Sequence, residues 1–334
     1  MVGDSRFVRL PIESLRRTRI ERSVLTKQLQ RTLKAPIHCT GAGLHSNTKV
    51  SMALKPAPPD TGVLFRRTDL GANAEIRAHR DNVIDSQLCT TIGNGNGLSV
   101  GTIEHLMAAF AGCGVENVIV ELNGAEVPIM DGSSRSFVFL IECAGIVEQN
   151  VPRRAIQVLS KITVGNESRW ASISPSDHFS LHCEIAFDHD AIGVQYFDYD
   201  SHQSSFEDDL SGARTFCLAS DVEKMRAAGL ALGGSLDNAV VIGEHGLLNE
   251  EGLRYDTEFA RHKALDCIGD LSLAGATLLA HVESYCAGHA MNHELLNALL
   301  DDETAWCWTD MDVLSIDRID AAPQVRHAAA AASA

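Results

Sequence analysis

The sequence predicts an α+β fold of two similar domains, each with helices packed on a mainly antiparallel sheet. Two series of short strands are each followed by helices, without the regular strand–helix alternation of a parallel sheet. With 334 residues, 45% of them hydrophobic, the chain suits two domains better than one. We therefore divide it into an extension predicted to be disordered (1–28), domain I (29–150), domain II (151–318) and a disordered tail (319–334).

Composition narrows the function classes. The net charge of −16 argues against a nucleic-acid-binding protein, because phosphate contacts need a basic surface. Nine cysteines without a CxxC pair indicate reduced thiols and a cytoplasmic location. No apolar run approaches the roughly 18 residues of a transmembrane helix, and the N-terminus lacks the apolar core of a secretory signal.

Basic residues are concentrated at the N-terminus. Residues 1–34 contain nine Lys or Arg and three acidic residues. Pro11 interrupts this segment, and one helix is predicted over 13–27. Two interpretations stay open: a dispensable tail, which we favour, and a basic arm that makes weak contact with a membrane surface.

Domain I is predicted to begin with strands and end with two helices. Asn-Gly steps within 93–97 indicate a hairpin between the runs 88–92 and 98–100, since the GxGxxG spacing of a phosphate-binding loop fails there. Helical spacing of apolar residues predicts helices over 102–112 and 134–144. Alternating or continuous apolar residues predict the remaining strands: 30–35, 49–54, 63–66 and 117–122.

Domain II repeats this order of elements. A polar connection is expected over 188–209, and a Gly-rich loop over 229–235. Three helices are predicted, over 213–228, 257–273 and 288–300. Strands are predicted from apolar runs at five places: 155–164, 169–173, 179–187, 239–242 and 277–284.

A polar row on one predicted helix organises the chemistry. Within 257–273, His262, Asp266 and Asp270 stand four residues apart and so share one face beside an apolar stripe. A histidine and a carboxylate at this spacing are able to bind one metal ion. Taken alone, the spacing is more typical of a salt-bridged surface face, with Arg261 and Lys263 nearby.

Glu104 and His105 place two ionisable groups in the first turn of an otherwise apolar helix. Buried charges are costly unless they are paired or bind metal, whereas in an exposed turn Glu104 would only favour the helix dipole. A catalytic zinc ion takes three protein ligands and leaves a fourth position for water, and two histidines with one aspartate meet that count. Glu104 would then be the spare carboxylate that accepts a proton from this water.

A competing metal pair stays open at this point. His289 and His293 also stand at positions i and i+4 of a predicted helix. If they bound the metal, Asp266 would have a structural role.

Six motifs, in chain order, carry a family resemblance: TIEHL at 102–106, VPIMDGS at 127–133, ARTF at 213–216, GLALGGS at 229–235, RHKALDCIGDL at 261–271 and GHA at 288–290. Together they resemble the zinc-dependent UDP-3-O-acyl-N-acetylglucosamine deacetylases of lipid A synthesis, over about residues 29–315. The resemblance implies two α+β domains, each with an insert, and an active site between them. It also implies a small-molecule substrate, the acylated UDP-glucosamine, and a monomer that hydrolyses its N-acetyl amide.

The resemblance assigns roles to the ionisable residues. It implies one catalytic zinc ion bound by His105, His262 and Asp266, with Glu104 as general base. His289 would stabilise the oxyanion or protonate the leaving amine.

Other residues are given supporting roles. Asp270 would orient His289, Thr215 would donate a hydrogen bond to the tetrahedral oxygen, and Lys263 would contact the diphosphate. His293 matches no role in that pattern, and we expect it at the surface.

The resemblance further implies an apolar passage for the acyl chain within the second-domain insert, about 213–243. Its apolar side chains would hide the chain from water. An ordinary self-packed insert is the alternative. The remaining residues expected to bind substrate are Leu88, Phe216, Gly234, Ser235 and Val241.

Two other function classes stay as alternatives. A non-catalytic UDP-sugar or acyl-binding protein would not need the three ligands, Glu104 and His289 together. A structural zinc site would not need the spare carboxylate.

Overall fold

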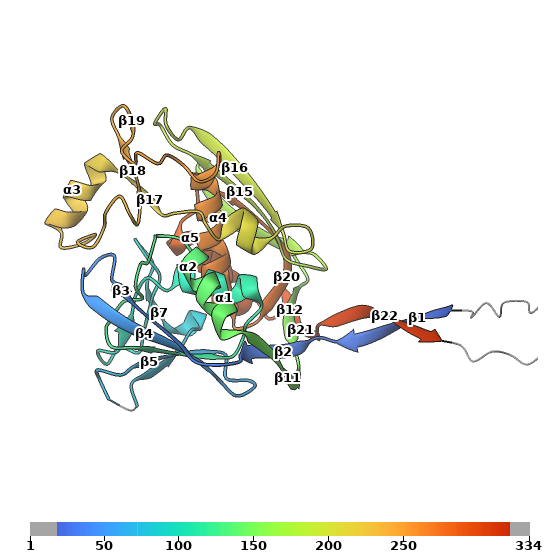
Figure 1. Cartoon of the computed structure of the whole chain (residues 1–334). Helices are drawn as coiled ribbons and strands as arrows, with labels where there is room; N and C mark the ends of the chain where they lie inside the picture. The colour runs from blue at the N-terminus through green and yellow to red at the C-terminus, as the bar shows by residue number, and fades with distance from the viewer. Residues whose placement is uncertain (1–18, 72, 321–334) are drawn as a thin grey trace, which may run out of the picture. The chain divides into compact units, whose positions relative to one another are not determined.

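The computed structural model describes residues 19–71 and 73–320 (Figure 1), which fall into two units. The larger unit covers residues 29–311. In the smaller one, β1 (Arg19–Lys27) and β22 (Asp312–Asp320) pair in antiparallel fashion along their whole length. No helix in the described part of the chain is both long and apolar enough to span a bilayer.

The helix predicted over 13–27 is wrong where the structure describes it, because residues 19–27 form strand β1. This segment contains the β-branched residues Ile20, Val24 and Thr26, which favour extended backbone. Strand β22 then supplies the backbone hydrogen bonds that a helix would have made internally. Disorder was predicted for 1–28 and 319–334, but residues 19–27 and 319–320 belong to these paired strands. The rest of that prediction, over 1–18 and 321–334, lies outside the described residues.

A five-stranded sheet forms the base of the first half of the larger unit. Its order is β3-β4-β10-β5-β6, with β10 and β5 parallel and the other neighbours antiparallel. Val118, Val120 and Leu122 are buried on alternate positions of the central strand, as expected for a sheet with one covered face. Its strands are β3 (Ile37–Ala42), β4 (Lys49–Pro56), β5 (Val63–Arg67), β6 (Glu75–Arg77) and β10 (Val118–Leu122).

Two smaller sheets accompany it. The predicted hairpin is confirmed as the antiparallel pair β8–β9, which also pairs with β7. Strand β2 pairs with β11, which ends the first half of the chain. The bounds are β2 (Leu29–Leu33), β7 (Val83–Asp85), β8 (Thr91–Gly93), β9 (Ser99–Val100) and β11 (Ile146–Pro152).

A seven-stranded sheet forms the second half. Strand β20 is central to it, antiparallel to β14 and parallel to β12 and β15. Along β20 every second residue is buried, which places one face of the strand against helices. The strands are β12 (Arg154–Val158), β13 (Ile162–Asn166), β14 (Arg169–Pro175), β15 (Ser180–Ala186), β16 (Val194–Asp200), β20 (Thr277–Tyr285) and β21 (Trp306–Asp310).

An insert follows, with a small sheet and one helix. Strands β17 and β18 are parallel, and β19 closes the sheet in antiparallel fashion. The helix α3 has no buried residue of its own, so one face is available to line a cavity. The elements are β17 (Phe216–Leu218), α3 (Ala219–Ala227), β18 (Val240–Gly243) and β19 (Gly246–Leu247).

Three predictions for domain II need correction. The strand predicted over 155–164 is two strands, β12 and β13, because the exposed turn at Leu159 separates them. The connection predicted over 188–209 contains β16, whose Phe197 and Tyr199 are buried on alternate positions. The helix predicted over 213–228 begins only at Ala219, since the residues before it pair with β18.

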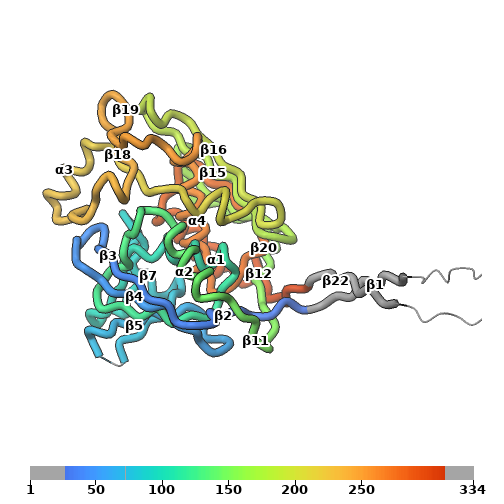
Figure 2. The backbone as a smooth tube through the Cα atoms, in the orientation of Figure 1, coloured from blue at the N-terminus to red at the C-terminus, as the bar shows by residue number. Residues whose placement is uncertain are grey.

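Four helices lie between the two large sheets (Figure 1). In Figure 2 the blue-to-green part of the chain forms the five-stranded sheet with α1 and α2, and the later part forms the seven-stranded sheet with α4 and α5. This arrangement confirms the α+β class, while the division near residue 150 stays a prediction. The bounds are α1 (Glu104–Cys113), α2 (Arg135–Ala144), α4 (Glu258–Leu271) and α5 (His289–Asp301).

A glycine allows α1 and α4 to cross closely. A Cβ atom at Gly269 would overlap the backbone carbonyl of Glu104. Glycine in a helix interior costs roughly 0.5–1 kcal/mol relative to alanine. In return, the two helix backbones approach closely, which brings His105 of α1 against the polar row of α4.

Candidate active site

The polar row of α4 is buried. His262, Asp266 and Asp270 are exposed by only 2%, 2% and 1% of their surfaces. Both α1 and α5 pack against α4, so the alternative of a salt-bridged surface face is excluded. Buried groups of this kind need partners, and the partners come from these two neighbouring helices.

His105 of α1 meets His262 and Asp266 in a cluster suited to a metal ion. One ligand atom from each residue lies within 4.8 Å of the other two. Nε2 of His105 lies 3.5 Å, and Nε2 of His262 3.4 Å, from Oδ1 of Asp266. That buried oxygen accepts no hydrogen bond within the described part of the chain, as expected of an atom that faces a cation. Two imidazoles and one carboxylate suit a first-row divalent metal.

The surroundings of His262 favour its neutral form. Its Nδ1 lies 3.1 Å from the carbonyl oxygen of Ala213 and donates to it, which leaves the lone pair on Nε2 facing Asp266. Burial lowers the pKa of His262 to about 3, against the opposing effect of Asp266. For Asp266, burial would raise the pKa, but the nearby positive charges of Lys263 and His289 hold it well below its usual range. The cluster therefore offers the neutral Nε2 of His262 and an ionised carboxylate.

Glu104 lies beside the cluster. It is 3% exposed, so the alternative of an exposed first turn is excluded. Its Oε2 accepts a hydrogen bond from the amide of Thr90 at 3.0 Å, while Oε1 lies 3.9 Å from Nε2 of His289. Burial raises the pKa of Glu104, and the nearby charge of His289 opposes this. A carboxylate with a raised pKa beside a metal cluster suits proton acceptance.

His289, at the start of α5, forms the second ionisable pair. Its Nδ1 lies 2.8 Å from Oδ2 of Asp270, to which the amide of Asn292 also donates at 2.8 Å. Its Nε2 lies 3.9 Å from both Oε1 of Glu104 and Oδ2 of Asp266. Burial would lower the pKa of His289, but Asp270 and Asp266 raise it to about 10. The ring is therefore a cation at neutral pH, and it faces the metal cluster.

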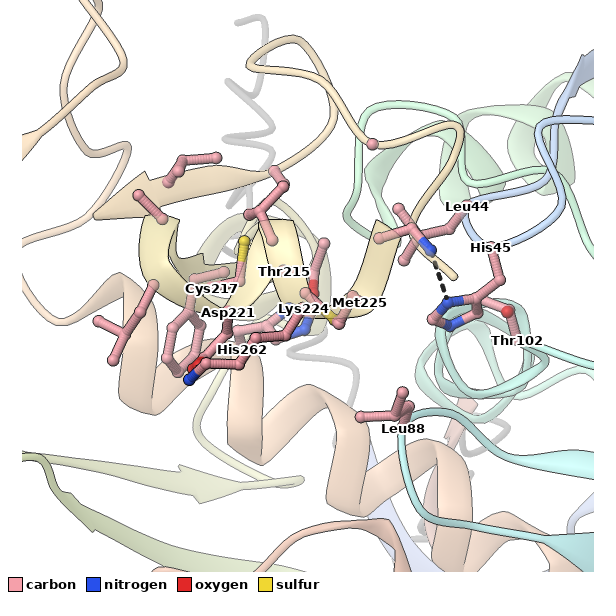
Figure 3. A pocket seen from close by; sticks show the side chains of 18 of the residues that line it. Leu44, His45, Leu88, Thr102, Thr215, Cys217, Asp221, Lys224, Met225 and His262 are labelled. Atoms are coloured by element: carbon pink, nitrogen blue, oxygen red, sulfur yellow. Dashed lines mark hydrogen bonds and ion pairs between the residues drawn. The ribbon is translucent and has the colours of Figure 1, made fainter. Parts of the chain in front are cut away.

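These groups open on one cavity of about 890 Å³. Its apolar lining comes mainly from β17, α3 and β18 (Figure 3), opposite segments of the first half that carry His45 and Leu88. Every residue predicted to bind substrate lines this cavity: Leu88, Phe216, Gly234, Ser235, Val241 and Lys263. Thr215, which is predicted to be catalytic, also lines it. The predicted roles of these residues stay predictions.

Comparison with known proteins agrees with this geometry. The family model described as UDP-3-O-acyl N-acetylglycosamine deacetylase (LpxC) matches residues 30–301. The chain belongs to this family.

Curated relatives match over nearly their whole length. One from Acidithiobacillus ferrooxidans is 48% identical over 283 residues, covering 84% of this chain and 93% of the relative. One from Pseudoalteromonas atlantica is 46% identical over 285 residues, covering 85% and 94%. One from Xanthomonas oryzae pv. oryzae is 49% identical over 281 residues, covering 84% and 92%. All three are named UDP-3-O-acyl-N-acetylglucosamine deacetylase, so the family predicted from the six motifs is confirmed.

Lys263 of this deacetylase family member points toward the cluster. Its Nζ donates to Oδ2 of Asp266 at 2.9 Å and lies 5.7 Å from the centre of the Phe216 ring. The side chain is one-quarter exposed and lines the cavity. Its predicted contact with the substrate diphosphate stays a prediction.

The expectation that His293 lies at the surface is wrong. Its exposed fraction is 5%, and its Nε2 lies 2.9 Å from Oγ1 of Thr90 and 3.5 Å from Oδ1 of Asp270. His289 and His293 thus face Asp270 rather than a shared metal. Among the described residues, only His105, His262 and Asp266 meet the geometry of a metal cluster.

Sequence reasoning missed the buried arginine that holds Thr215 in place. Arg214 is 2% exposed, and its guanidinium donates to both carboxylate oxygens of Glu258, at 2.8 and 3.1 Å. The amide of Thr215 donates to Gly132, and its carbonyl accepts from Val240, both at 2.8 Å. Thr215 is therefore fixed on the cavity wall by backbone bonds and by the adjacent ion pair. The place of Arg214 within the ARTF motif at 213–216 was the only signal for it.

His45 is a second cavity residue that the sequence alone does not single out. It lines the cavity, and its carbonyl accepts from the amide of Leu232 at 3.2 Å, while the carbonyl of Leu44 accepts from Gly233 at 2.9 Å. Glu126 holds this loop by accepting from the amide of His45 at 2.8 Å. No spacing in the sequence connects this loop to the Gly-rich loop over 229–235.

Proposed function

We propose that this protein is a metal-dependent deacetylase that releases acetate from the glucosamine nitrogen of UDP-3-O-acyl-N-acetylglucosamine, an early step of lipid A synthesis. One observation carries the proposal: Glu104 and His289 flank the His105–His262–Asp266 cluster in a single cavity. Family membership supports the substrate class, because the curated relatives carry that name.

Zinc is the metal that we propose. Three ligands with a buried, hydrogen-bond-free carboxylate oxygen fit a catalytic site rather than a closed four-ligand one. Zinc bound there would act as a Lewis acid. It would also lower the pKa of water, so that the water loses a proton readily and attacks the amide.

Glu104 and His289 are proposed to carry out the proton transfers. Glu104 accepts a proton through Oε1 as the water oxygen attacks the amide carbon, since its Oε2 is held by Thr90. His289 enters as a cation, so its Nε2–H stabilises the developing oxyanion and then protonates the amine as the C–N bond breaks. Thr215, on the cavity wall, adds a hydrogen bond to the oxyanion. The products are acetate and a free amine.

Asp270 is proposed to keep His289 charged and correctly turned, because it accepts from Nδ1 at 2.8 Å. Lys263 is proposed to contact the diphosphate. The acyl chain is proposed to lie along the apolar wall formed within 213–243, where Phe216 and Val241 line the cavity. Leu88, Gly234 and Ser235 would complete the substrate contacts.

We further propose two domains that meet near residue 150 with the site between them, and a monomeric protein in the cytoplasm. The nine free cysteines support a reducing compartment.

Acetate release from the acylated UDP-glucosamine tests the proposal. We expect turnover by the metal-loaded protein, its loss after chelation, and its return on adding zinc. Binding of the substrate without acetate release would favour the alternative of a non-catalytic UDP-sugar or acyl-binding protein. Turnover that survives complete removal of the metal would rule out metal dependence.

A further inference from the structure

Asp270 is held by more than its histidine partner. Its Oδ2 accepts from His289 and Asn292, each at 2.8 Å. Its other oxygen, Oδ1, accepts from the hydroxyl of Thr90 at 2.5 Å. Since two oxygens bonded on different sides fix the plane of a carboxylate, Thr90 controls the direction in which Asp270 presents Oδ2 to His289.

Thr90 also holds the other side of the site. Its amide donates to Oε2 of Glu104 at 3.0 Å, and its carbonyl accepts from the amide of Ile103, just before α1, at 3.3 Å. The residue is completely buried. One side chain and its backbone thus connect Glu104 with Asp270, which come from different helices.

The protons available in this network show whether His293 donates or accepts its hydrogen bond. A hydroxyl has one proton, and in Thr90 this proton goes to Asp270. The contact of 2.9 Å between Thr90 Oγ1 and His293 Nε2 then requires Nε2 to carry the hydrogen and to donate. Nδ1 of His293 has no hydrogen-bond partner among the described residues, which agrees with a ring protonated on Nε2. His293 therefore prevents the Thr90 hydroxyl from turning away from Asp270.

We propose that Thr90 and His293 are positioning residues. They fix the position and orientation of Glu104 relative to the Asp270–His289 pair across the active site. This inference rests on the proposed deacetylation, because the relative placement of the two groups matters only if both act on one substrate. Neither residue touches the metal cluster or is required to contact the substrate. Their loss should lower kcat and leave KM unchanged.

Thr90→Val tests the hydroxyl with little change in shape. We expect the metal-loaded full chain to lose about 10- to 100-fold in kcat, the size expected when one hydrogen bond to a buried charged group is lost. KM and bound metal should stay unchanged, and Thr90→Ser should restore kcat to within a few fold. Thr32→Val is the matched control, because its buried hydroxyl donates to a carbonyl of Asn117 remote from the cavity lining. It should lower the melting temperature without lowering kcat.

His293→Phe and His293→Gln test the histidine side of the contact between Thr90 and His293. The first removes the Nε2 donor and should lower kcat with KM unchanged, and the second returns an N–H group near the same place and should recover most of it. This pair carries the test if Thr90→Val does not fold. Folded, metal-loaded Thr90→Val or His293→Phe protein with undiminished kcat would overturn the proposal. Lack of turnover by the unsubstituted protein would instead refute the deacetylase function itself.

Discussion

The pKa values of two buried histidines in this protein are shifted in opposite directions. His262 and His289 are each at most 7% exposed, and each lies near an aspartate of α4. Yet the pKa of His262 is lowered to about 3, while that of His289 is raised to about 10.

The difference comes from the partner of Nδ1. His262 donates from Nδ1 to the neutral carbonyl of Ala213, and burial therefore dominates its pKa. His289 places Nδ1 against the charged Asp270, whose attraction outweighs burial. One residue type is thus neutral in one region and cationic in the other, as the proposed roles of metal ligand and acid require. Burial alone would not have separated the two roles.

The largest effect should come from removing the ligand histidine. We expect His262→Ala to lose both bound metal and turnover, because the cluster keeps only two ligands. His289→Ala should keep its metal and lose rate only. Elemental analysis of the purified proteins measures this directly. If both variants bound equal metal, the division between ligand and acid would be wrong.

Glu104→Ala should have the next largest effect. The residue lies beside the proposed ligand His105 and outside the cluster suited to a metal ion, so we expect normal metal content. The rate should fall by about 10²–10⁴-fold, typical of a lost general base. Metal analysis and single-turnover rates check this together. Metal-free Glu104→Ala protein would move Glu104 into the ligand set.

Asp270→Asn should make His289 behave more like His262. Without the anionic partner the pKa of His289 should fall from about 10 toward the ordinary 6.5, so the alkaline limb of kcat/KM should move to lower pH. At about pH 8.5 the loss would be roughly 10- to 100-fold, because few rings would still be protonated.

Asp301→Asn is the control for that change. It removes one negative charge from the same helix as His289, but at an exposed position that pairs with Arg80. Its pH profile should match that of the unsubstituted protein. An unmoved alkaline limb in Asp270→Asn would mean that Asp270 only supports the fold.

The smallest expected effect tests the role of the apolar cavity wall separately from that of the polar groups. Val241→Trp should narrow the cavity, and each CH₂ forced back into water costs about 0.8 kcal/mol, so excluding two would lower kcat/KM roughly 15-fold for the long-chain substrate. A substrate without the acyl chain should be affected little, and the pH profile should not change. Equal losses for both substrates, with metal content and melting temperature unchanged, would refute the passage.

The sequence predicted what depends on local periodicity. The row His262, Asp266 and Asp270 followed from helical spacing alone, and the structure confirms that these residues share a buried face. The approach of His105 to that row is a tertiary contact between helices far apart in sequence, and the family resemblance was needed to predict it.

Other parts of the site had no local signal. Thr90 has the β-branched side chain of an ordinary strand residue, and only the packing of α4 and α5 brings Asp270 and His293 to its hydroxyl. His293 was expected at the surface because nothing in its own segment indicates burial. Hydrogen-bond partners contributed by another element depend on tertiary packing, which helical or strand periodicity does not encode.

The close crossing at Gly269 makes the metal site dependent on folding. Two ligands come from α4 and one from α1, so the three are assembled only when the helices are in contact. A metal bound there would favour the native state over the unfolded chain, by about 2.7 kcal/mol at a free concentration one hundred times its dissociation constant. A methyl group at position 269 would separate the helix backbones and weaken metal affinity without altering a single ligand. The affinity for a metal at this site would therefore also measure how closely α1 and α4 are packed together.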